Sequence, residues 1–131
     1  MTFNSNKAIY LQMADRLCDE VLAGTYGADD RIPSVREYAV MLGVNSNTVV
    51  KAYDELARAN IIYNRRGMGY YVMPGAREQI QQERRQHFML KQLPELFHHM
   101  QLLGISIDEV NNAWNESKAT NKCYKTKENS A

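Results

Sequence analysis

The sequence predicts a mainly α-helical protein with a small β-hairpin, arranged as a winged helix-turn-helix followed by a short C-terminal α-helical segment. Three observations support this fold class. Apolar residues recur at helical spacing in the first half of the chain, a glycine-bearing turn separates two of the helices, and two β-rich segments flank a basic tip that contains glycine. A chain of 131 residues has room for one such domain and a short appendage.

The composition is that of an ordinary globular chain, with 44% hydrophobic and 24% charged residues. No apolar run reaches the ~18 residues of a membrane helix and the N-terminus lacks a signal-peptide pattern, so we expect a cytoplasmic protein with no membrane partner. The formal net charge is only +1. Any binding to nucleic acid must therefore depend on where individual cations are placed.

The first helix is predicted over residues 8–23, where apolar residues recur at steps of three and four, and Gly24 ends it. A second, short helix is predicted to begin at Ser34. Ser34 and Glu37 have the spacing of a capping box, in which each side chain binds the other residue's backbone amide. Gly43 is predicted to end this helix, because glycine readily adopts the left-handed conformation of a C-cap.

A third helix is predicted over residues 46–60, with Asn45 or Ser46 as its N-cap and with a polar outward face. Segments 61–63 and 70–72 are rich in β-branched and aromatic residues, and we expect them to pair as a hairpin. Two helices joined by a tight turn and followed by a basic hairpin are typical of a winged helix-turn-helix.

Helical periodicity resumes over residues 76–103, and Pro94 is predicted to kink or split this stretch. Another helix is predicted over residues 106–117, beginning with a serine N-cap and early acidic residues. The polar residues 118–131 carry no apolar pattern, and we expect them to form a disordered tail.

In a helix-turn-helix, the second helix enters the major groove of DNA and its first turn contacts the bases. Here that turn offers amide, hydroxyl and cationic side chains, which suit base edges and phosphates. An arginine on the preceding helix and two in the hairpin would contact phosphates, and the hairpin glycines would let the backbone approach the duplex closely. The predicted DNA-contacting residues are Ser34, Arg36, Asn45, Ser46, Asn47, Thr48, Lys51, Arg65, Arg66, Gly67 and Gly69.

Three linked motifs carry a resemblance to a known family: P-S-V-R-E at 33–37, G-V-N-S-N-T-V at 43–49 and R-R-G-M-G at 65–69. Through these motifs residues 9–72 resemble the N-terminal domain of the GntR family of bacterial transcription regulators. The part of the chain that follows residue 72 is short, and in this respect the protein is similar to the YtrA-type subgroup. The resemblance implies a homodimeric regulator that binds a double-stranded DNA operator, and we expect a repressor. The implied organisation is a DNA-binding domain over 1–75 and a helical dimerisation segment over 76–117, followed by the tail.

The chain departs from the family pattern at several positions. Many GntR members have arginine at the positions of Ser46 and Val50, so the resemblance implies no particular operator sequence. Met68, Tyr70 and Tyr71 also differ from the more usual small or polar residues of the hairpin. These three side chains would either pack the hairpin or contact a minor groove.

The apolar side chains of the C-terminal helices are too many for so few helices to bury, which favours a dimer interface. Two alternatives remain. The same helices could bind an unknown small-molecule effector, and the winged helix could bind a protein instead of DNA, because fold alone does not determine function. The predicted dimerisation residues are Phe88, Leu93, Leu96, Phe97, Met100 and Trp114.

No residue pattern indicates an enzyme, a cofactor site or a metal site. His98 and His99 are adjacent, so they point in different directions on a helix, and His87 completes no known ligand spacing with them. Cys18 falls in an apolar helical pattern and Cys123 in a polar segment, which does not indicate a disulfide. We therefore expect a binding protein with no cofactor.

Overall fold

The computed structural model describes residues 7–129 of the chain, with side chains described for residues 7–119. It consists of two compact units, divided between Gln86 and His87. The predicted fold class is confirmed: helices predominate, and one two-stranded antiparallel hairpin follows the third helix. The elements are α1 (Ile9–Leu22), α2 (Val35–Leu42), α3 (Ser46–Arg58), β1 (Ile62–Arg65), β2 (Gly69–Val72), α4 (Ala76–His87), the π-helical turn η1 (Phe88–Gln92), α5 (Leu93–Leu103) and α6 (Ile107–Asn129).

The core of the first unit lies where α1, α2, α3 and the hairpin meet. Met13, Leu17 and Val49 are fully buried there, because apolar residues at helical spacing give each helix one face that must leave water. Two tyrosines extend this core and still satisfy their hydroxyls. Tyr53 donates a hydrogen bond to the carbonyl of Pro33 at 2.7 Å, and Tyr38 donates to Glu20 at 3.2 Å.

The ends of α2 and the start of α3 form as the sequence predicts. The Ser34 hydroxyl accepts a hydrogen bond from the Glu37 amide at 3.1 Å, and the Glu37 carboxylate accepts one from the Ser34 amide. Gly43 ends α2 in the left-handed conformation, at φ 66°. Of the two possible N-caps of α3, Asn45 takes the role, since its side-chain oxygen accepts from the amide of Asn47 at 2.8 Å.

Both strands of the hairpin extend further toward its tip than predicted. Ile62 pairs with Val72 at one end, and Arg65 pairs with Gly69 at the other. The segment before α2 also lies along β2. The amide of Ile32 donates to the carbonyl of Tyr70 at 3.0 Å, and an isolated antiparallel bridge joins Arg31 to Tyr71. This third segment was not predicted, because a few residues of irregular chain carry no apolar alternation.

Most of helix α4 packs with the first unit, whereas the sequence analysis placed the end of the DNA-binding domain at residue 75. Ala76 and Ile80 are buried in the core of that unit, so the chain divides eleven residues or so further on, at Gln86. The expected break at Pro94 takes a specific form. The chain stays helical through the π-helical turn η1, which ends at Gln92, into α5, which begins at Leu93 and has Pro94 in its first turn, where a proline lacks the amide that an α-helical hydrogen bond would use.

The structure describes a helix over most of the segment for which the sequence predicts a disordered tail, residues 118–131. Helix α6 continues to Asn129, and residues 130–131 lie outside the described residues. The segment contains several lysines, an alanine and a glutamate, which are good helix formers although they leave no apolar periodicity. None of the described helices is both long enough and apolar enough to cross a membrane.

Candidate nucleic-acid interface

The first turn of α3 presents polar side chains to solvent. Val49 is fully buried and fixes the orientation of the helix, which leaves Ser46, Asn47 and Lys51 exposed and Thr48 half-buried. Within the described part of the chain, the side-chain amide of Asn47 makes no hydrogen bond. A free amide can donate and accept at the same time, which is the arrangement that an adenine edge requires in the major groove.

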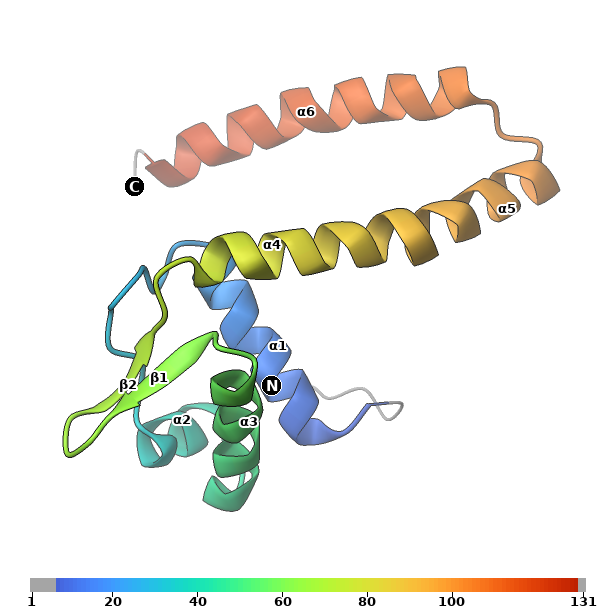
Figure 1. The fold of residues 1–131 in the computed structure, drawn as a ribbon. Coiled ribbons are helices and arrows are strands. Elements are labelled where there is room, and N and C mark those ends of the chain that lie inside the picture. Colours follow the sequence, from blue (N-terminus) through green and yellow to red (C-terminus); the bar gives the residue numbers. More distant parts are fainter. Residues whose placement is uncertain (1–6, 130–131) are drawn as a thin grey trace. The chain divides into compact units, whose positions relative to one another are not determined.

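Helix α2 adds one free cation, and its N-cap serves mainly to hold the helix. Arg36 is exposed and forms no ion pair with any described residue. The hydroxyl oxygen of Ser34 is engaged in the capping box, so only its O–H remains to donate to a phosphate. Figure 1 shows α2, the first turn of α3 and the tip of the hairpin at the same, lower end of the first unit.

Arg65 lies over two aromatic rings of the hairpin. Its guanidinium carbon is 4.8 Å from the ring centroid of Tyr71 and 5.7 Å from that of Tyr63. The two rings stack with centroids 5.8 Å apart, and the Tyr63 hydroxyl donates to Asp29 at 2.6 Å. This hydrogen bond raises the pKa of Tyr63 above its ordinary value. The rings thus hold the guanidinium in place while leaving the side chain exposed.

The remaining aromatic residues of the hairpin pack it, which decides between the two alternatives for Tyr70 and Tyr71. Tyr70 meets Tyr53 edge to face at 5.1 Å between centroids, and Tyr71 is buried. Met68 differs, since it is 58% exposed at the tip. Arg66 is exposed beside it, and Gly67 forms the turn at φ 76°.

Arg31 is a cation near the hairpin that the sequence analysis did not include. It is exposed, and it forms the bridge to Tyr71. Gly69 adopts φ 110°, and a Cβ at Gly69 would lie 3.2 Å from Nε of Arg31. The glycine therefore leaves room for the arginine to lie against the strand. Gly69 in the R-R-G-M-G motif predicts that some group lies close to the strand backbone at this point. The motif alone does not predict that this group is the Arg31 side chain.

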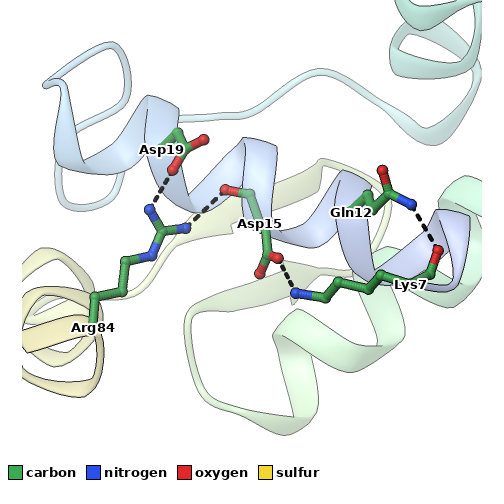
Figure 2. A network of polar contacts seen from close by, with 5 residues as sticks. All are labelled: Lys7, Gln12, Asp15, Asp19 and Arg84. Carbon is green, nitrogen blue, oxygen red and sulfur yellow. Dashed lines mark hydrogen bonds and ion pairs between the residues drawn. The ribbon is translucent and has the colours of Figure 1, made fainter. Parts of the chain in front are cut away.

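Cations of the first unit divide into paired and unpaired groups. Those along α1 are neutralised: Arg16 pairs with Glu20, and Figure 2 shows Lys7 bound to Asp15 and Arg84 bound to Asp19. By contrast, the cations of the candidate interface have no ion pair among the described residues. These are Arg31, Arg36, Lys51, Arg65 and Arg66.

The network in Figure 2 also attaches α4 to α1. The guanidinium of Arg84 donates both to the Asp19 carboxylate and, at 3.0 Å, to the backbone carbonyl of Asp15. Cys18 is buried on the same helix, and burial raises the pKa of its thiol to about 11. This cysteine is therefore an uncharged core residue near neutral pH.

The predicted dimerisation residues fall on η1, α5 and α6, and most are exposed within one chain. Phe88, Leu96, Phe97 and Trp114 are 45%, 43%, 44% and 60% exposed, whereas Leu93 is half-buried and Met100 is buried. The predicted dimerisation set did not include further apolar side chains that are exposed in the second unit. These are Met89, Leu90, Leu102, Leu103, Ile105 and Ile107.

Comparison with known proteins agrees with this architecture. The chain is 33% identical over 108 residues to the HTH-type transcriptional regulator YhcF of Bacillus subtilis, covering 82% of this chain and 88% of YhcF. Residues 9–72 match the family model described as bacterial regulatory proteins, gntR family. The chain belongs to the GntR family.

Other members match along most of the length of this GntR protein. The HTH-type transcriptional repressor YtrA of Bacillus subtilis is 33% identical over 106 residues, which cover 81% of each chain. A GntR-family transcriptional regulator from Bacteroides thetaiotaomicron has a similar solved structure, with a TM-score of 0.70, 43% identity, and coverage of 87% of this chain and 99% of that one. The protein is thus a DNA-binding transcription regulator of the YtrA-like group, and the relatives are regulators rather than enzymes.

Proposed function

We propose that this GntR protein binds a two-fold symmetric DNA operator as a homodimer and represses transcription from it. The observation that carries the proposal is the set of free polar groups at the start of α3 and at the hairpin. Among the described residues the Asn47 side-chain amide makes no hydrogen bond and the five cations form no ion pair, whereas the cations along α1 are paired. Groups left free in this way can bind bases and phosphates without first breaking an internal contact.

Homodimerisation is supported by the second unit. Its apolar side chains on η1, α5 and α6 remain exposed in one chain, and Phe97 and Trp114 are among them. Aromatic residues that gather at such density on one small unit usually lie in an interface. A two-fold axis through this unit would present two α3 helices to successive major grooves, so the half-site centres would lie ~10 bp or a multiple apart.

Repression is supported by the relative YtrA, which is named a transcriptional repressor. The test begins by selecting bound duplexes from a random DNA pool with the full chain. The selected sequence is then footprinted and placed in a reporter promoter. We expect two inverted half-sites, a dimer mass by sedimentation, and lower reporter expression when the protein is present. An asymmetric single site bound by a monomer would contradict the proposal, as would increased expression.

Control by a small-molecule effector stays a prediction. One hollow in the first unit has a volume of about 230 Å³ and is lined by residues that include Tyr26, Met73 and Arg77. Ligand pockets are usually ~300–1,000 Å³, so this hollow gives the idea little support. A thermal-shift screen of metabolites on the full chain tests it directly, since a ligand that binds the folded protein raises its melting temperature.

A further inference from the structure

Val50 is an exposed valine on the outward side of α3, the helix whose first turn is proposed to contact the bases. It is the fifth residue of α3 and is 42% exposed, although its neighbour Val49 is fully buried. It takes no part in the core cluster of the first unit. Its side chain therefore contributes little to holding α3 in place, and the structure leaves its two methyl groups in water.

The surroundings of Val50 are polar. Ser46 and Asn47, one turn before it, are exposed, and so are Lys51 beside it and Asp54 one turn after it. On an ideal helix Val50 lies about 60° around the axis from Asn47, so the two side chains flank each other in the same part of α3. A single exposed valine is common on protein surfaces. This one lies among the side chains that the proposed function brings into the major groove.

The chemistry of the groove limits what an aliphatic side chain can contact there. Base edges in the major groove present donors and acceptors, and thymine adds a C5-methyl group. A valine placed against a donor or acceptor would strip it of water without replacing the hydrogen bond, which is unfavourable. Against a methyl group, both surfaces lose water and binding gains. The stiff χ1 of a β-branched residue also means that little side-chain freedom is lost.

We propose that Val50 is a specificity-determining residue that contacts the C5-methyl group of one thymine in each operator half-site, next to the base pair contacted by Asn47. The proposal rests on the proposed function, because it requires α3 to lie in the major groove. It predicts a preference for thymine over cytosine at that position. Cytosine methylated at C5 would restore the contact, because it carries a methyl group at the same place on the ring.

The experiment removes single methyl groups from the DNA. Each thymine of the selected operator is replaced in turn by deoxyuridine, symmetrically in both half-sites, and the dissociation constant of the full chain is measured by fluorescence anisotropy. One position should lose about fourfold in affinity per half-site, the effect of burying one methyl-sized group. At that position, 5-methylcytosine should bind more tightly than cytosine by a similar factor.

Protein variants then test whether the dependence of affinity on that methyl group requires the Val50 side chain. V50A should bind the thymine duplex as weakly as the wild type binds the deoxyuridine duplex, and it should no longer distinguish the two. Alanine favours the helix more than valine does, so fraying of α3 cannot cause the loss. I9A is the matched control, because Ile9 is 47% exposed on α1, and this variant should keep the full methyl dependence.

The outcomes separate the two proposals. If the wild type binds a specific operator and every deoxyuridine duplex equally well, or if V50A keeps the methyl dependence, the role of Val50 is refuted and the proposed function stands. If no specific DNA sequence is selected at all, both proposals fail together.

Discussion

Arg65 illustrates how an exposed cation can be positioned without an ion pair. Two stacked tyrosine rings lie beneath its guanidinium, and one of them is itself held by a hydrogen bond to Asp29. An aromatic platform restricts the side chain without pairing its charge, whereas a carboxylate would neutralise it. The arginine can thus bind a phosphate with less loss of side-chain freedom than a cation that moves freely in solvent.

Replacing Arg65 by alanine should weaken binding to all DNA sequences by a similar factor. A phosphate contact carries no base information, and its loss should reduce the slope of log affinity against log salt concentration by about one. N47A should instead change the preference for particular base pairs, at a cost of about 1–3 kcal/mol for the preferred base. Anisotropy titrations on the operator and on scrambled DNA at several salt concentrations measure both effects.

Arg85 provides the control for this charge, since it is an exposed cation on α4 outside the candidate interface. R85A should leave the affinity and the salt slope close to those of the wild type. Equal effects of R85A and R65A would mean that only total charge matters, and a sequence preference unchanged in N47A would show that α3 is oriented differently from our proposal.

The buried thiol of Cys18 should make stability depend on pH in alkaline solution. Its pKa is raised to about 11 by burial, so between pH 9 and 11 the unfolded chain releases a proton that the folded chain retains. Stability from this group is complete below that range and is lost as pH rises through it, amounting to about 1 kcal/mol by pH 10.

Urea unfolding of two proteins measures the effect of this thiol. One carries C123S alone, and the other carries C123S with C18A. The tyrosines titrate equally in both proteins, so their effect cancels in the difference between the two unfolding free energies. The stability advantage of the protein that keeps Cys18 should shrink with rising pH. A difference between the two proteins that stays constant from neutral pH to pH 10 would contradict the shifted pKa.

At the scale of elements, the sequence was most informative where a local rule determines the backbone. The Ser34–Glu37 capping box, the C-cap at Gly43 and the hairpin all form as predicted, because each depends on residues close together in the chain. The bridge from Arg31 to Tyr71 could not be predicted in this way, since the contact joins residues 40 positions apart with no shared pattern. The candidate site shows the same limit: the α3 and hairpin residues were predicted, but Arg31 was not.

Two helical elements differ from the sequence prediction for a related reason. Apolar periodicity reports burial, so it ends near Ser117, although helix α6 continues to Asn129 through polar helix formers. Helix α4 was assigned to the dimerisation segment because its apolar pattern, Ile80 included, continues into that of the following helices over residues 76–103. Only packing shows that Ala76 and Ile80 belong to the winged-helix core.

The attachment of α4 to α1 should depend on Arg84. R84A removes the contacts to Asp19 and to the Asp15 carbonyl, and we expect the free energy of unfolding to fall by about 1 kcal/mol, since the pair is partly exposed. Hydrogen exchange of the α4 amides should also become faster. Chemical denaturation with R85A as the adjacent control tests this, and equal stability of the two variants would mean that the buried Ala76 and Ile80 alone hold the helix.

At the scale of the whole molecule, the proposed homodimer predicts that changes to the exposed apolar surface of the second unit alter both oligomeric state and DNA affinity. F97E places a charge at a position that is 44% exposed in one chain, so the monomer should fold normally but fail to dimerise. Operator affinity should then fall by ~10²-fold or more, because two linked DNA-binding domains bind far more tightly than one. Sedimentation and anisotropy on the same samples measure the two effects.

His98 supplies the matched position for this test. It follows Phe97 on α5 and is exposed, and on an ideal helix it lies about 100° further around the axis, on the side away from Leu93, Leu96 and Met100. H98E adds the same charge and should remain dimeric. A monomeric H98E with a dimeric F97E would require a different interface.

The division between paired and unpaired cations affects how the protein finds its site. With a net charge of +1, the molecule as a whole feels little attraction to a distant duplex, and at physiological salt charges are screened beyond ~8 Å. We therefore expect a collision through α1, where the cations are paired, to be shorter than one through the helix-turn-helix and hairpin, where five cations form no ion pair among the described residues. If α3 binds the major groove as proposed, we expect the encounters that last longest to be those in which α3 already faces the DNA.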